Sequence, residues 1–153
     1  MQTHFPDNDG VLNFNDGFIG GQCNALPIIG RSFYERFGYI YYPSYKALVC
    51  NVELTHVAKM LNKERVIDQV IIKHNHPAWG AGPMDASYKR SESFHNQDAA
   101  LFMKRRTQQF DLTQDEINAN HPMLWSILIC TIEGREKSYE QLCSKLKSQI
   151  DTL

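Results

Sequence analysis

Apolar side chains recur at steps of three and four residues shortly after a pair of glycines near the N-terminus. The recurring positions are Leu26, Ile29, Phe33 and Phe37. This spacing is typical of a helix that buries one stripe of its surface. Gly38 follows the last apolar position, where a helix commonly ends. We therefore expect an amphipathic helix that begins at Cys23 and ends at Gly38.

The segments on either side of this helix have other patterns. Residues 1–20 are rich in Asn, Asp and Gly, which favours turns with short extended pieces such as Val11 to Phe14. After the helix, short apolar runs predict three strands, and a polar gap of hairpin-loop length separates the second from the third. The expected strands are residues 47–52, 55–61 and 65–72. They would form a small antiparallel sheet.

The second half of the chain has a loop followed by helical patterns. Residues 74–83 contain two prolines and two glycines, which predicts a loop. Apolar positions predict a helix over residues 93–109, and Thr113 with Glu116 has the spacing of a capping box that opens another. Two more helices are expected, one from Pro122 and one over residues 139–150.

These elements predict one α+β domain over residues 1–153, in which the cysteine-bearing helix packs on a small antiparallel sheet. Its expected parts are an N-terminal arm (1–20), the Cys23 helix with the sheet (21–90) and a helical C-terminal part (91–153). A chain of 153 residues is long enough to bury a core of its own. We therefore expect it to fold without a disulfide or a metal.

Charge and apolar runs narrow the classes of function. The net charge is −1, so no basic excess indicates nucleic-acid binding. No apolar run approaches the length of a membrane span, and the N-terminus lacks the basic start and apolar run of a signal peptide. We expect no nucleic-acid partner and no membrane partner. The expected location is the cytoplasm, or a host cell into which the protein is delivered without a standard signal peptide.

Cysteine usage bears on the redox compartment and on chemistry. The four cysteines are far apart and form no CxxC pair; they are Cys23, Cys50, Cys130 and Cys143. This pattern favours free thiols in a reducing compartment. A thiol at a helix N-terminus lies at the positive end of the helix dipole, which favours the thiolate. Cys23 is therefore the candidate nucleophile.

A nucleophilic cysteine needs a base, and the base needs a group that orients it. If residues 55–61 and 65–72 form a hairpin that turns near Lys63, then His56 and Asp68 lie opposite each other on adjacent strands. A carboxylate in that position can hold an imidazole in the tautomer that a base requires. The hypothesis is thus a triad of Cys23, His56 and Asp68.

The order Cys, His, Asp, with the cysteine at the head of a helix and the other two on a following hairpin, resembles the transglutaminase-like branch of the papain-fold enzymes. The separations are 33 residues from Cys23 to His56 and 12 from His56 to Asp68, similar to those in lasso-peptide leader peptidases. The stretch Gly-Gly-Gln-Cys at residues 20–23 is similar to the Gly-Gly-x-Cys of arylamine N-acetyltransferases. The resemblance covers roughly residues 20–72.

The resemblance implies a papain-like core and a role for each residue of the triad. Cys23 would attack a carbonyl carbon, His56 would accept the thiol proton and later protonate the leaving group, and Asp68 would orient the imidazole. The Cys23 backbone N–H and one side-chain amide would bind the oxyanion. The candidate amides are those of Gln22, Asn13 and Asn15. The implied activity is that of a thiol hydrolase or acyl transferase on a protein or peptide amide, with no cofactor.

A second reading concerns the stretch His74-Asn75-His76-Pro77. It resembles the zinc-binding stretch of JAMM-type metalloproteases, in which two histidines and a later aspartate bind zinc. Asp85 would be the third ligand, although it is out of register with that motif. Glu53 or Glu64 would act on the bound water. In a variant of the thiol mechanism, His74 or His76 is the base for Cys23, and Asp85 orients it.

The non-enzymatic alternative is a phage-borne or effector protein that binds and inhibits a partner. Its helical C-terminal half would dock on that partner, and the basic run at residues 104–106 would be the contact. The substrate and the oligomeric state are left open by the sequence.

Overall fold

A computed structural model of the chain describes residues 1–77, 80–119, 140, 141 and 144. The chain divides into two compact units, residues 1–122 and residues 123–153. The three described residues of the second unit are helical. The single-domain expectation stays a prediction, because most of the second unit lies outside the described residues. Within the described ranges, no helix has the length and apolar character needed to span a membrane.

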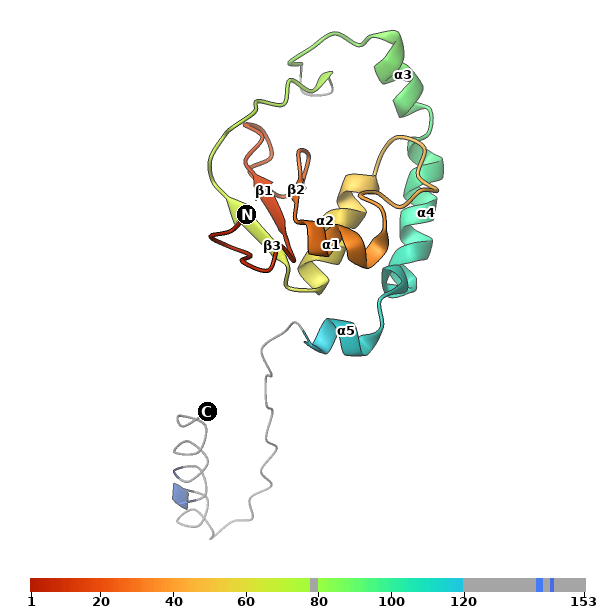
Figure 1. Cartoon of the computed structure of the whole chain (residues 1–153). Helices are drawn as coiled ribbons and strands as arrows, with labels where there is room; N and C mark the ends of the chain where they lie inside the picture. Colours follow the sequence, from red (N-terminus) through yellow and green to blue (C-terminus); the bar gives the residue numbers. More distant parts are fainter. Residues whose placement is uncertain (78–79, 120–139, 142–143, 145–153) are drawn as a thin grey trace. The chain divides into compact units, whose positions relative to one another are not determined.

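The first unit is built on a three-stranded sheet with the strand order β2-β1-β3 (Figure 1). The central strand β1 (Val11–Phe14) confirms the extended piece expected there. It pairs antiparallel with β2 (Ile28–Ile29), where Val11 faces Ile29. It pairs parallel with β3 (Glu64–Ile67), where Asn13 faces Val66. The sheet therefore joins segments that are about 50 residues apart in sequence.

The helix expected from Cys23 to Gly38 is half as long as predicted. Helix α1 (Arg31–Phe37) starts only after Gly30 and ends at Gly38, whose φ of 71° is left-handed. Residues 20–27 form turns and irregular backbone, and residues 28–29 are held extended because they pair with β1. Cys23 is therefore not at a helix N-terminus, and the predicted favouring of its thiolate by a helix dipole is wrong.

The strands predicted over residues 47–52 and 55–61 are wrong, because α2 (Cys50–Met60) occupies this region. Its buried apolar residues have helical rather than alternating spacing; they are Leu54, Val57 and Ala58, with Leu61 at its end. They pack with Val11 and Phe33 in the core. A stripe spaced at three and four residues buries one helix face, whereas on a strand these residues would point to both faces. Of the third strand, predicted over residues 65–72, only the part within β3 is a strand.

The helical second half is confirmed where it is described. Helix α3 (Ala86–Glu92) precedes α4 (His95–Thr107), which matches the helix predicted over residues 93–109. A short 3-10 turn, η2 (Gln109–Asp111), leads to α5 (Gln114–Ala119). The predicted capping box is present: the Thr113 N–H donates to Glu116 Oε2 at 2.8 Å, and the Glu116 N–H donates to Thr113 Oγ1 at 3.2 Å. The helices expected from Pro122 and over 139–150 lie outside the described residues, apart from residues 140, 141 and 144.

The described part of the chain is thus α+β, with helices beside a small mixed sheet. Two buried polar clusters join α4 to the elements before it. Asp98 accepts the backbone N–H groups of Lys46, Ala47 and Leu48 at 2.8–3.0 Å. Arg105 contacts both carboxylate oxygens of Glu53 at 2.9 Å.

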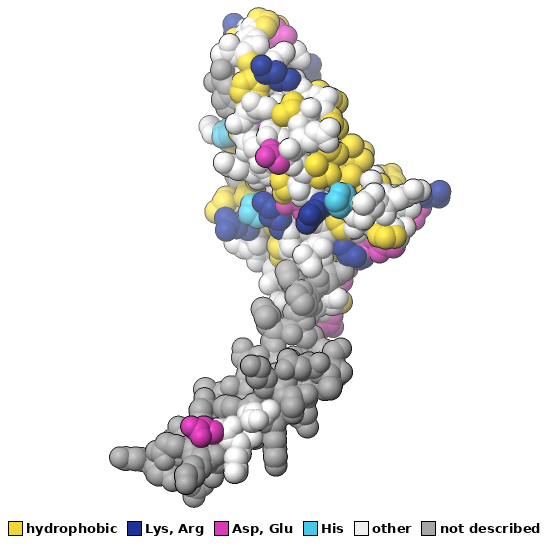
Figure 2. Space-filling view, turned by 90° about the vertical axis from the view of Figure 1, so that its left-hand side faces the viewer, with side chains coloured by type: hydrophobic (Ala, Val, Ile, Leu, Met, Phe, Trp, Pro, Cys, Tyr) yellow, Lys and Arg dark blue, Asp and Glu magenta, His cyan; other side chains and the backbone are white. Residues whose placement is uncertain are grey.

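The outer strand β3 and the segment after it carry apolar side chains at the surface. The exposed residues are Val66, Val70, Ile71 and Ile72. Figure 2 views the molecule from the side on which β3 lies in Figure 1, and hydrophobic side chains are visible on this face. Strand β3 ends at Ile67, and Val70, Ile71 and Ile72 follow it at the surface.

Candidate functional site

Polar side chains gather where β1 and β3 end. Because the two strands are parallel, their carboxyl ends lie at the same edge of the sheet, which is where open α/β sheets place ligands. Asn15 and Asp16 directly follow β1, and Asp68 directly follows β3. The Asn15 amide donates to Asp68 Oδ1 at 2.7 Å. We call residues 15–25 the β1 loop.

Asp16 is the buried carboxylate of this loop, with 2% of its surface exposed. Its Oδ1 accepts the backbone N–H groups of Phe18 and Ile19 at 3.0 and 2.9 Å. Burial raises the pKa of Asp16, but the two N–H groups and the nearby His74 lower it more strongly, so the net shift is downward. Asp16 is therefore held as a carboxylate despite its burial.

His74 lies beside this carboxylate and comes from the segment after β3. Its Nδ1 atom is 3.7 Å from Asp16 Oδ2, and about a third of its side chain is exposed. Its backbone N–H donates to the Asp16 carbonyl oxygen at 3.0 Å. Both the main chain and the side chain of His74 therefore lie beside Asp16. The ring of His76 packs against that of His74 with centroids 5.0 Å apart. The structure thus assembles a carboxylate–imidazole pair.

Two fully buried asparagines line the inner side of the β1 loop. The Asn13 amide donates to the Gly21 carbonyl oxygen at 2.8 Å and to Glu64 Oε1 at 3.0 Å. The Asn24 backbone N–H donates to the Thr55 hydroxyl at 2.9 Å. The side-chain oxygens of both asparagines are buried and accept no hydrogen bond from the described residues. Such atoms are rare in folded proteins, and each one calls for an explanation, such as a bound water, an ion or a catalytic role.

In the structure, Cys23, His56 and Asp68 each contact residues outside the predicted triad. The Cys23 sulfur lies 3.9 Å from the Thr55 hydroxyl, which also donates to the Asn51 carbonyl oxygen at 2.8 Å. Burial, the largest effect, raises the pKa of the Cys23 thiol, the opposite of what a ready nucleophile needs. His56 lies on α2, not on a strand, and packs on the rings of Phe102 and Phe110.

Asp68 and the predicted oxyanion donors also differ from the hypothesis. Because His56 is helical, it is not the cross-strand neighbour of Asp68, which instead accepts from Asn15 at the surface. Asn13 and Asn15 are both committed to hydrogen bonds near the strand ends. Gln22 is exposed and donates its backbone N–H to the Ile19 carbonyl oxygen. Six of the residues singled out from the sequence nevertheless lie in or beside the β1 loop; they are Asn13, Asn15, Gln22, Cys23, Asp68 and His74.

The zinc alternative finds no third ligand in the described ranges. Asp85 caps α3 by accepting the Tyr88 N–H at 2.7 Å. His76 packs on Tyr88, with ring centroids 5.3 Å apart. Within residues 1–77 and 80–119, no group of three His, Cys, Asp or Glu side chains is placed to hold a metal ion. The carboxylate shown beside His74 is that of Asp16, which the sequence did not suggest as an orienting residue.

Asp16 is the site residue that the sequence reasoning missed. The run Asn15-Asp16-Gly17 predicts a turn. An acidic residue directly after a buried strand was the available signal, because strand ends position polar groups at a sheet edge. Searches against protein-family models, curated proteins and solved structures found no match to this chain.

Proposed function

We propose that the first unit carries a general-base site in which Asp16 orients His74, and that this base deprotonates a water or a hydroxyl in hydrolysis or acyl transfer. The observation that supports it is the buried Asp16 carboxylate 3.7 Å from Nδ1 of a partly exposed imidazole. A buried carboxylate beside one ring nitrogen is the arrangement that makes the other nitrogen a base.

The roles follow from the two ring nitrogens. With the proton on Nδ1, facing Asp16, the Nε2 atom keeps a lone pair that can accept a proton. As the ring becomes an imidazolium, the neighbouring negative charge stabilises it. The separation is longer than a hydrogen bond, and sites without substrate commonly have such looseness. Exposure of about a third of the His74 side chain gives a substrate access to the ring.

Water or a substrate hydroxyl suits this base better than Cys23 does. The raised pKa of Cys23 keeps its thiol protonated near neutral pH, and the negative charge of Asp16 contributes to that shift. A papain-like core would also require the cysteine at a helix N-terminus, whereas α1 begins at Arg31. The thiol mechanism therefore stays a prediction without geometric support, and the reaction class of hydrolysis or acyl transfer is kept.

Chemical modification tests the orienting role directly. We expect diethylpyrocarbonate to modify His74 faster than the exposed His4, because the Asp16 carboxylate stabilises the positive charge that the ring gains as Nε2 is acylated. Asp16→Asn keeps the Oδ1 acceptor for the Phe18 and Ile19 N–H groups but removes the charge. It should slow modification of His74 several-fold and leave that of His4 unchanged. Equal rates for His74 in the two proteins would contradict the proposal.

Ester hydrolysis tests the chemistry and separates it from the thiol mechanism. With p-nitrophenyl acetate as probe, His74→Gln should lower the rate by about 10²-fold, the lower end of what a positioned acid or base contributes. Cys23→Ser and His56→Gln should leave the rate unchanged. A loss of activity in Cys23→Ser with none in His74→Gln would favour the cysteine instead.

A further inference from the structure

Exposed apolar side chains lie next to His74. Three of them occupy the run that ends one residue before it, and the fourth belongs to the β1 loop. They are Val70, Ile71, Ile72 and Phe18, each with 39–57% of its surface exposed. We call these four residues the apolar patch.

The turn after Asp16 brings the two parts of the apolar patch together. A Cβ at Gly17 would lie 3.4 Å from Cγ of Lys73 and 3.9 Å from Cγ1 of Val70. The Lys73 Nζ atom lies 5.7 Å from the centre of the Phe18 ring. Because Gly17 directly follows Asp16, the apolar patch adjoins the carboxylate of the proposed base site.

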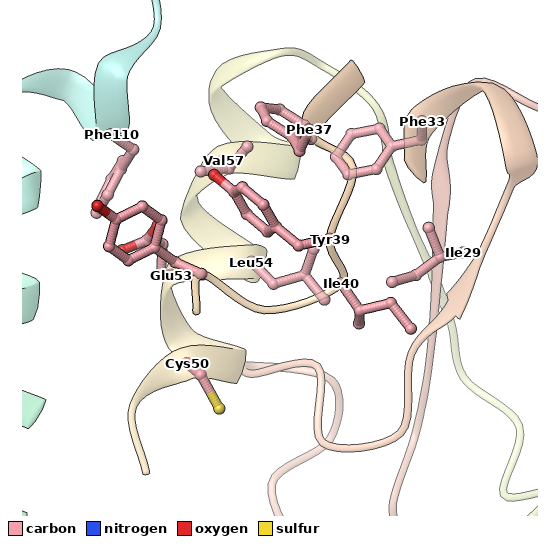
Figure 3. Close-up of a pocket in the computed structure, with 11 residues that line it drawn as sticks. Ile29, Phe33, Phe37, Tyr39, Ile40, Cys50, Glu53, Leu54, Val57 and Phe110 are labelled. Carbon is pink, nitrogen blue, oxygen red and sulfur yellow. The ribbon is translucent and has the colours of Figure 1, made fainter. Parts of the chain in front are cut away.

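The pocket between α1, α2 and residues 39–42 is too small to hold an apolar substrate group (Figure 3). The side chains that line it leave about 20 Å³ of free space. A cavity of this size holds about one water, whereas a group the size of benzene needs on the order of 150 Å³. An apolar substrate group would therefore find its contacts at the apolar patch rather than in this pocket.

The side chains of the apolar patch determine which chemical group would bind there. Single exposed apolar residues are ordinary, whereas a contiguous group of them commonly marks a binding surface. Three of the four side chains are branched aliphatic groups, and none of the four can form a hydrogen bond. The apolar patch therefore suits the hydrocarbon part of a substrate, and the polar groups around His74 suit its carbonyl part.

We propose that the substrate is an ester with an aliphatic acyl chain, which lies on the apolar patch while its carbonyl group faces the water that His74 deprotonates. This substrate class rests on the proposed function, because it belongs to the same site. The water oxygen adds to the carbonyl carbon, the ester C–O bond breaks, and the proton accepted by His74 passes to the departing oxygen. Each methylene that the apolar patch removes from water should favour the bound state.

A series of chain lengths tests this substrate class. The measurement is kcat/KM of the full chain for p-nitrophenyl acetate, butanoate and hexanoate. Each value is divided by the rate constant for free imidazole with the same ester, which corrects for intrinsic reactivity. The corrected value should rise about tenfold or more from acetate to hexanoate. Equal corrected values for the three esters would overturn the proposal.

Matched variants locate the acyl chain. Ile71 and Ile40 are similarly exposed, at 47% and 50%, but Ile40 lies outside the apolar patch. Ile71→Ser should lower the hexanoate-to-acetate ratio several-fold, and Ile40→Ser should leave the ratio as it is. An unchanged ratio in Ile71→Ser would overturn the proposal. A dimer that Ile71→Ser disrupts in analytical ultracentrifugation would show that a second copy covers the apolar patch, and would overturn it too.

Protection of His74 gives a readout that does not depend on turnover. p-Nitrophenyl hexyl ether carries the chain without a carbonyl group, and the corresponding ethyl ether is the short-chain control. The hexyl ether should slow diethylpyrocarbonate modification of His74 several-fold, and the ethyl ether at the same concentration should not. Equal effects of the two ethers would overturn the role of the apolar patch. That result would leave the general base standing, because Asp16→Asn and His74→Gln test the base separately.

Discussion

In the first unit, single buried carboxylates connect segments that are far apart in the sequence. Asp98 is fully buried and binds three consecutive backbone N–H groups before α2. Burial raises its pKa, but these N–H groups and the charge of Lys46 lower it more, so the acid is ionised in the folded protein. At the scale of the residue, the Asp98 carboxylate supplies the hydrogen-bond acceptors that this irregular backbone would otherwise lack.

Asp98→Ala should destabilise the first unit by about 2–4 kcal/mol, because three buried N–H groups lose their acceptor. Asp98→Asn should cost less, since one oxygen still accepts. Urea unfolding followed by circular dichroism measures both, and Asp115→Ala on the exposed face of α5 is the control. A cost below about 0.5 kcal/mol for Asp98→Ala, the range of ordinary surface changes, would contradict this account.

Glu53 and Arg105 form a buried ion pair in which each partner is costly to remove alone. The Arg105 guanidinium also stacks on Tyr42, 3.4 Å from the ring centroid. Arg105→Met should cost about 3–5 kcal/mol, because Glu53 is then left charged and buried. The double variant Arg105→Met with Glu53→Gln should recover part of that loss in the same unfolding assay. Additive costs would show that the pair is not coupled.

At the scale of the element, the two ends of α1 depend on glycine for different reasons. A Cβ at Gly30 would overlap the Asn8 carbonyl oxygen, because the N-terminal arm passes directly over this residue. Gly38 has open space around it, but its φ of 71° is strained for other residues. The start of the helix is thus determined by a tertiary contact, and its end by local backbone geometry.

Gly30→Ala should therefore destabilise the protein more than Gly38→Ala. The second change should cost about 1–2 kcal/mol, the penalty of a left-handed residue with a side chain. The first should exceed that, because arm and helix must separate. Thermal unfolding of the two variants provides the comparison, and equal costs would mean that the arm moves aside freely.

Local signals predicted the helices that begin or end at identifiable residues. The capping box of Thr113 and Glu116 and the glycine at position 38 need only neighbouring residues to act, and both are confirmed. Residues 47–61 lack such a signal, and their short apolar runs suit a strand as well as a helix. Packing of Leu54 and Val57 in the core favours the helix α2 over a strand.

At the scale of the whole molecule, several groups link stability to pH. The pKa values of Asp9, Asp16 and Asp98 are lowered in the folded state, so their contribution to stability is present above the usual carboxyl pKa and is lost as the pH falls from there through the lowered pKa values. Burial, followed by the charges of Arg106 and Lys59, lowers the pKa of His56. The unfolded chain therefore protonates His56 first as the pH falls below about 6.5.

The free energy of unfolding should accordingly decline in two stages on acidification, a small one below about pH 6.5 and a larger one below about pH 4. His56→Gln should remove the His56 contribution to the first stage and leave the second. Urea unfolding between pH 3 and pH 8 checks this, with His95→Gln at an exposed site as the control. Stability that rises between pH 7 and pH 5 would contradict the assignment.

The sequence by itself determined the features that neighbouring residues can produce: the short extended piece at β1, the end of α1, the capped start of α5, and the α+β class. Only the tertiary structure decided which distant segments meet. The parallel pairing of β1 with β3 brings Asp16 to His74, a contact between residues 58 positions apart. Such a contact depends on burial and strand register across the sheet, which no local pattern encodes. The local motif around His74 is enough to predict it as an alternative base. Its carboxylate partner, Asp16, can be identified only from the fold.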